Sequence, residues 1–135
     1  MIQRVSHTSL YVLDQERARR FYTEKLGFEV RRDEATGPFR WLTVGPKGQP
    51  DFELILMGIQ PGPMIDEDDC ARLRELVGKG VFGAGIFATA DCRKTFDELK
   101  ARGVEFVAPP TERPYGIEAL LKDDSGNWFS MVQAR

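Results

Sequence analysis

The residues best suited to chemistry in this sequence are one histidine and one glutamate. His7 is the only histidine among 135 residues, and it lies in the strand-like run of residues 6–13. Glu53 interrupts the apolar run DFELILM of residues 51–57. A carboxylate in such a run must be paired, bound to a metal or shifted in pKa, because burying a lone charge is costly. The two side chains could ligate a divalent metal, or Glu53 could act as a general base that His7 orients.

The segment of residues 4–30 indicates which elements position the histidine. Residues 6–13 mix β-branched, aromatic and polar side chains as strands do, and Asp14 then offers a carboxylate to the first free N–H groups of a helix. Apolar residues recur at helical spacing until Gly27, which suits the left-handed position that ends a helix. Residues 28–30 restart an extended run. The segment therefore predicts a β-α-β unit.

Turn residues divide the chain that follows this unit. A Gly-Pro pair at residues 37–38 separates two extended runs, and a third strand covers residues 51–57. The sequence GIQPGP then breaks the pattern and opens a linker, residues 58–79, that contains one short helix. The first module therefore covers residues 3–57 and has the order βαβββ.

The second half of the chain repeats the order of the first. Asp14 and Asp91 are 77 positions apart, and Gly27 and Gly103 are 76 positions apart. Each pair marks the start or the end of a predicted helix. We therefore expect a second βαβββ module at residues 80–134, within a single domain that covers the whole chain.

Two such modules predict an α+β fold. Each module would combine one helix with a four-stranded antiparallel sheet. The helix would cover the outer face of its sheet, and the two sheets would meet edge to edge as a curved half-barrel. The concave inner faces would then form a cup. Alternation along the strands assigns side chains to this cup, and those expected there are His7, Ser9, Tyr11, Glu53, Ile55, Met57, Trp128 and Ser130.

Composition limits the classes of function. The chain has 19 basic and 21 acidic residues, and it lacks the basic patch that nucleic-acid binding requires. No apolar run approaches the roughly 20 residues of a membrane-spanning helix, and no signal-peptide pattern follows Met1. We therefore expect a cytoplasmic protein that binds neither nucleic acid nor membrane. Cys70 and Cys92 are 22 positions apart without a CxxC motif, and we expect both to be reduced.

The order and spacing of several motifs resemble the vicinal oxygen chelate superfamily, which includes glyoxalase I, bleomycin-resistance proteins, fosfomycin-resistance proteins and extradiol dioxygenases. The motifs are His7-x-x-Leu10-x-Val12-x-Asp14, Phe21-Tyr22, Leu26-Gly27-Phe28, Glu53-Leu54 and Asp123-Asp124-Ser125-Gly126-Asn127. The resemblance implies paired βαβββ modules around a cup and, often, a homodimer. In the enzymes it also implies a divalent metal that chelates two adjacent substrate oxygens.

The same resemblance assigns the metal-ligand positions. The family draws one ligand from the first strand and one from the last strand of each module, and these positions match His7 and Glu53 in the first module. The offset of 77 carries them to Ala84 and Ser130 in the second. A methyl group is no ligand and a serine hydroxyl is a poor one, so two ligands remain where a catalytic site keeps three. The expected cofactor is therefore none, or a weakly held divalent metal.

Three classes of function remain open. The first is a metal-dependent lyase, isomerase or dioxygenase, and the second is a metal-free enzyme that uses Glu53 as general base. The third, which we expect, is a binding protein that holds a small carbonyl-containing or aromatic ligand in the cup. Glu53 would anchor this ligand, and Tyr11 and Trp128 would form apolar walls. Desolvation should raise the pKa of Glu53, whereas His7 within reach would lower it.

Further ligand-binding candidates follow from position in the predicted fold. Ala84 is included because of the offset, and Tyr115 because it lies beside Arg113 and Pro114 in a loop that forms either a lip over the cup or a solvated turn. The candidate ligand-binding residues are Ser9, Tyr11, Ile55, Met57, Ala84, Tyr115, Trp128 and Ser130. We also expect a homodimer, because exposed sheet edges promote association. The sequence leaves open whether one chain or two build the cup.

Overall fold

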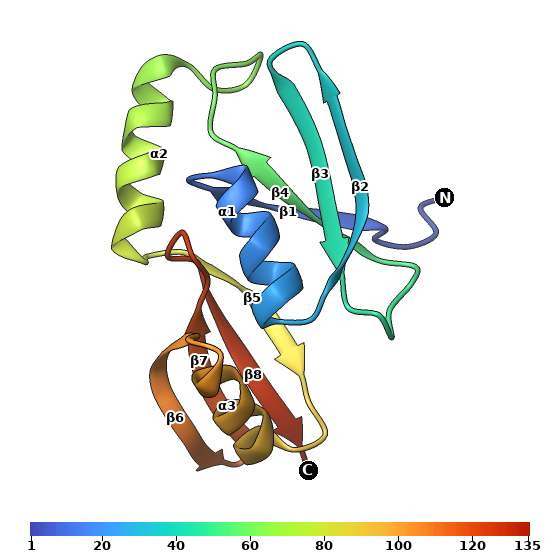
Figure 1. Ribbon diagram of the computed structural model, residues 1–135, viewed down its shortest axis with the longest axis vertical. Helices are drawn as coiled ribbons and strands as arrows, with labels where there is room; N and C mark the ends of the chain where they lie inside the picture. Colours follow the sequence, from blue (N-terminus) through green and yellow to red (C-terminus); the bar gives the residue numbers. More distant parts are fainter.

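The computed structural model describes residues 1–135 and contains eight strands and four helical segments (Figure 1). The first module comprises β1 (His7–Val12), α1 (Gln15–Arg20), its π-helical continuation η1 (Phe21–Lys25), β2 (Glu29–Thr36), β3 (Phe39–Gly45) and β4 (Glu53–Gly58). Helix α2 (Glu67–Lys79) links it to β5 (Gly83–Ala88), α3 (Cys92–Ala101), β6 (Glu105–Arg113), β7 (Gly116–Lys122) and β8 (Trp128–Ala134). The α+β class with two βαβββ modules is confirmed.

The helices begin where the sequence predicts. The Asp14 carboxylate accepts a hydrogen bond of 2.8 Å from the backbone N–H of Arg17, and the Asp91 carboxylate accepts one of 3.0 Å from the N–H of Lys94. Both carboxylates therefore satisfy N–H groups that have no partner within the helix. No helix of the chain has both the length and the apolar character needed to cross a membrane.

Each module forms its own four-stranded sheet, in the orders β1-β4-β3-β2 and β5-β8-β7-β6. The sheets are mixed, which corrects the expectation of antiparallel sheets: β1 runs parallel to β4, and β5 runs parallel to β8. The reason is the helix between the first two strands. It returns the chain to the end where the first strand began, and two hairpins then give the last strand the direction of the first.

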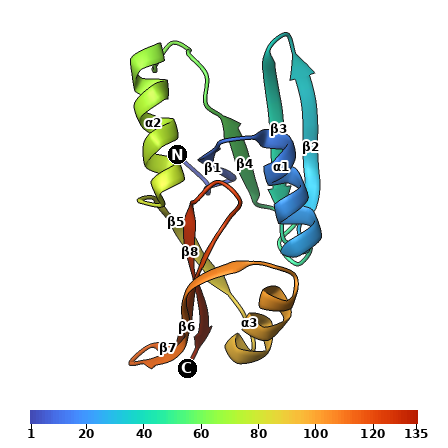
Figure 2. The ribbon, with the colours of Figure 1, turned by 60° about the vertical axis from the view of Figure 1, so that its left-hand side comes forward.

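The two sheets do not join edge to edge, because no strand of one is hydrogen-bonded to a strand of the other. Instead, their outer faces share one hydrophobic core, which includes Leu10 and Leu56 from the first module and Leu121 and Met131 from the second. Figure 2 shows the two modules following one another along the long axis, with α2 beside the first sheet. Since the outer faces meet in the core, the inner faces point away from it and do not enclose a common cup.

Aromatic rings and a polar turn connect the modules. Phe28 and Tyr22 of the first module meet Phe87 and Phe129 of the second edge-on, at 5.6 Å and 6.4 Å between ring centroids. The buried Tyr22 hydroxyl donates a 2.7 Å hydrogen bond to the Asp123 carboxylate, which also accepts three backbone N–H bonds from its own turn. Asn127 donates to the backbone carbonyl of Tyr11 at 2.8 Å. The turn of residues 123–127 therefore holds the two modules together.

Candidate functional site

His7 and Glu53 lie side by side on the inner face of the first sheet. They are paired residues of β1 and β4, and His7 Nε2 lies 3.5 Å from Glu53 Oε2. The second carboxylate oxygen accepts a 2.6 Å hydrogen bond from the hydroxyl of Thr43 on β3. On the opposite side of the imidazole ring, His7 Nδ1 lies 2.8 Å from Ser6 Oγ. The Glu53 carboxylate is therefore held through both oxygens, and its side chain remains 24% exposed.

Aromatic side chains of β3 continue this surface. The Trp41 ring lies 6.2 Å from the His7 ring, and the Phe39 ring lies 6.4 Å from Trp41. The inner face of β3 carries Phe39, Trp41 and Thr43, and Leu42 between them is buried in the core on the other side. Sequence reasoning missed all three inner-face residues, although this alternation with period two is the signal that could have revealed them.

The remaining candidates of the first sheet extend the same face along β1 and β4. Ser9 pairs with Ile55, and Tyr11 pairs with Met57, so that the four side chains follow the His7 and Glu53 pair in two-residue steps. Tyr11 is 36% exposed, whereas Leu10 beside it is buried in the core. The first sheet therefore presents one polar end and one apolar end to the same side.

The inner face of the second sheet carries a carboxylate that sequence reasoning did not select. Glu118 of β7 accepts hydrogen bonds from the Ser130 hydroxyl and, at 2.7 Å, from the Tyr115 hydroxyl. The Arg113 guanidinium lies 3.8 Å away. The two hydroxyl bonds, followed by the Arg113 charge, hold the pKa of Glu118 below its usual value, although burial opposes the shift. Glu118 is therefore ionised at neutral pH.

The structure corrects the position that the offset of 77 assigns to the second module. Strands β5 and β8 are irregular between Gly83 and Gly85, and beyond this point Ile86, not Ala84, pairs with Ser130. Ala84 packs against the core instead, while Ile86 is 73% exposed on the inner face. The Trp128 ring lies against Gly83, where an added Cβ would meet the ring at 2.6 Å.

These residues do not form a catalytic metal centre of the usual kind. His7 and Glu53 supply two ligands, and the corresponding residues of the second module are the hydrocarbon side chain of Ile86 and a hydroxyl that already donates to Glu118. No group of three or more His, Cys, Asp or Glu side chains in the chain is arranged to hold a metal ion. A catalytic zinc site ordinarily has three protein ligands, so the donor set of one chain falls short.

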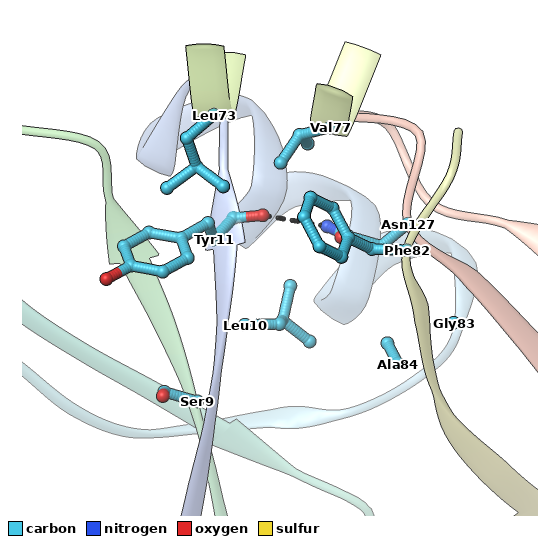
Figure 3. Close-up of a pocket in the computed structure, with 9 residues that line it drawn as sticks. All are labelled: Ser9, Leu10, Tyr11, Leu73, Val77, Phe82, Gly83, Ala84 and Asn127. Atoms are coloured by element: carbon cyan, nitrogen blue, oxygen red, sulfur yellow. Dashed lines mark hydrogen bonds between the residues drawn. The ribbon is translucent and has the colours of Figure 1, made fainter. Parts of the chain in front are cut away.

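A pocket of about 240 Å³ lies where β1 meets α2 and the start of β5 (Figure 3). Ser9 and Tyr11 line it from β1, Leu73 and Val77 line it from α2, and Phe82 closes the opposite side. This volume is below the range of about 300 to 1,000 Å³ that ligand pockets usually have, so the pocket is small for a ligand site. None of the five main pockets includes His7 or Glu53. A single chain therefore leaves its polar pair on an open surface.

Comparison with known proteins identifies the family to which this fold and site belong. Residues 4–131 match the family model described as the glyoxalase/bleomycin resistance protein/dioxygenase superfamily. The chain belongs to this superfamily. The resemblance seen in the sequence motifs is thereby confirmed, and with it the two-module fold. Members of the superfamily often bind a divalent metal, but the fit described above identifies no particular metal for this chain.

Three known proteins are similar to this chain over nearly their full length. The protein YurT of Bacillus subtilis (strain 168) is 37% identical over 131 residues, which cover 93% of this chain and 95% of YurT. The crystal structure of UcmS2 superposes with a TM-score of 0.94 at 49% identity, covering 99% of this chain and 100% of UcmS2. TnmS3 from Streptomyces sp. CB03234, an antibiotic binding protein, has a TM-score of 0.77 at 29% identity over 99% of this chain and 98% of TnmS3.

Proposed function

We propose that this protein binds a small aromatic molecule in a cup built by two copies of the chain. The observation that carries the proposal is the open inner face of the first sheet. It places the His7 and Glu53 pair beside the Trp41 ring, without a covering wall from its own chain. Ligand pockets combine a few convergent polar groups with mostly apolar walls, and this surface supplies both.

A second copy of the chain is the simplest source of the missing wall. Within one chain the outer faces share the core, so the inner face of the second sheet is equally open, with Ile86 73% and Val107 56% exposed. A twofold dimer that places the second sheet of one copy over the first sheet of the other would cover both faces at once. The dimer would form two identical cups and would bury apolar area on the inner faces of both sheets in each copy.

Binding without catalysis fits the donor set better than metal chemistry. Two protein ligands leave a divalent ion mostly hydrated, whereas Glu53, Tyr11 and Trp128 suit a polar anchor between aromatic walls. The likeness to TnmS3, an antibiotic binding protein, supports a small antibiotic-like molecule as the kind of ligand.

A titration with acridine, a planar fluorescent molecule that is uncharged at neutral pH, tests this proposal. We expect saturable binding, and we expect Trp41→Ala and Trp128→Ala each to weaken it roughly twentyfold because they remove an aromatic wall. Trp128→Phe is the matched control, since it keeps a ring at the same position. Sedimentation at micromolar concentration should give twice the mass of one 15.3 kDa chain. Equal affinity in the wild type and both alanine variants would refute the cup.

A further inference from the structure

The two modules contain the same hydroxyl-carboxylate pair with the two groups exchanged between strands. In the first module Thr43 of β3 donates to Glu53 of β4. In the second module Ser130 of β8 donates to Glu118 of β7. Since β8 is the counterpart of β4 and β7 the counterpart of β3, the carboxylate has moved to the neighbouring strand.

The two pairs occupy equivalent places in their sheets. Thr43 pairs with Ile55, which lies two residues beyond Glu53. Glu118 pairs with Val132, which lies two residues beyond Ser130. Both contacts therefore join diagonal neighbours on one face of an antiparallel strand pair. The second sheet lacks a carboxylate at position 130, but it presents one through the adjacent strand at the same level.

The exchange keeps a negative charge on each inner face. Both carboxylates accept hydrogen bonds from neutral hydroxyl groups, which leave the charge in place and leave further lone pairs free. Glu53 also faces the His7 imidazole at 3.5 Å. The Arg113 guanidinium faces Glu118 at 3.8 Å without a hydrogen bond and is half exposed, so it offsets little of this charge. The other charged groups of these faces occur in pairs of opposite sign, Arg32 with Glu34 and Lys122 with Glu105.

We infer that Glu118 is the second carboxylate anchor of the binding cup and that the ligand is a planar aromatic cation. The inference rests on the proposed function, because a shared cup brings the Glu118 of one copy opposite the Glu53 of the other. Two fixed carboxylates on opposite walls select a ligand with a protonated amine. The rings of Trp41, Tyr11 and Trp128 favour the same charge, because a cation is attracted to an aromatic face.

Three acridines that share one ring system test the inference. They are 9-aminoacridine, a cation at pH 7.5, neutral acridine, and anionic acridine-9-carboxylate. We expect the wild type to bind the cation most tightly and the anion least tightly. Glu118→Gln should weaken binding of 9-aminoacridine about tenfold and leave acridine within about twofold, because only the charge is lost. Glu112→Gln is the matched control, since Glu112 is exposed, lies on the adjacent strand and should change neither affinity.

A second variant separates anchoring from folding. Ser130→Ala keeps the carboxylate and removes the hydroxyl that positions it, so we expect a loss of about threefold for 9-aminoacridine. If Glu118→Gln binds all three acridines like the wild type while Glu53→Gln weakens the cation, Glu118 is structural, and the cup itself stands. If the anion binds as tightly as the cation, the charge of the ligand is assigned wrongly. If no acridine binds to the wild type, the cup and its second anchor are both refuted.

Discussion

A shared cup predicts that two defective chains can restore one intact site. The perturbation combines Glu53→Gln in one chain with Trp128→Ala in the other. In a dimer with shared cups, the first sheet of the Glu53→Gln chain faces the second sheet of the Trp128→Ala chain, so both defects fall in one cup. The other cup then contains two wild-type faces. If each cup belonged to one chain, every cup of the mixed dimer would carry one defect.

The expected size of each defect follows from the contacts. Glu53→Gln replaces a charge-assisted hydrogen bond by a neutral one, which costs about 1.5 kcal/mol, or roughly a tenfold loss in affinity for 9-aminoacridine. Trp128 is already partly covered by Gly83, so a ligand would bury only part of the ring. Burial of about 70 Å² at ~25 cal/mol/Å² contributes ~1.7 kcal/mol, or roughly twentyfold.

The assay requires a mixed dimer purified through two different affinity tags and titrated with 9-aminoacridine. We expect one site per dimer with the affinity of the wild type and a second, much weaker site. Each homodimer of a single variant serves as control and should show only weakened sites. A mixed dimer without any site of wild-type affinity would show that the cup is not shared between chains.

Three further predictions concern single interactions. Tyr22→Phe removes the buried hydroxyl that donates to a carboxylate of the other module, which should cost about 1.5 kcal/mol and lower the Tm by about 5 °C in calorimetry. Ser130→Ala should raise the pKa of Glu118 toward its ordinary value in a ¹³C NMR titration, because a hydroxyl donor to the carboxylate is lost. Ile86→His with Ser130→Glu should bind nickel or zinc far more tightly than the wild type, because it adds an imidazole and a carboxylate opposite His7 and Glu53.

Each of these predictions has a result that contradicts it. An unchanged Tm in Tyr22→Phe would show that the hydroxyl contributes nothing to the contact between modules. The pKa of Glu118 is lowered by folding, so its stabilising effect is present above the pKa of the unfolded chain and is lost as the pH falls through the folded value. A Ser130→Ala variant whose stability differs from the wild type only at low pH would contradict that sign. Metal binding by Ala84→His with Ser130→Glu, and not by the Ile86 variant, would contradict the register of β5 and β8.

The sequence alone determined the elements and much of the first inner face. Asp14 and Asp91 mark the helix starts because an N-cap is a local interaction between residues three positions apart. The alternation in β1 separates the buried Leu10 from the exposed Tyr11, and the same rule assigns both His7 and Glu53 to the inner face. Such assignments depend only on the period of a strand, which neighbouring residues already express.

The second inner face required the tertiary structure. Counting along the chain carries His7 to Ala84, but the irregular ladder near Gly83 places Ile86 beside Ser130. A bulge changes which residues are paired without changing the type of any residue, so the offset cannot report it. Glu118 is invisible to the same count for a related reason. It partners Ser130 from an adjacent strand, and the register of two strands depends on their whole length.

The tertiary structure also decided where the two inner faces point. The repeat predicts two similar modules but carries no information on which faces pack together, because both faces of each sheet contain apolar residues. Phe28 meets Phe87 edge-on, and Tyr22 reaches the carboxylate of Asp123, both across the boundary between modules. These contacts join residues up to 101 positions apart. They bury the helix-covered outer faces of both sheets in one core, so the inner faces are left exposed to solvent.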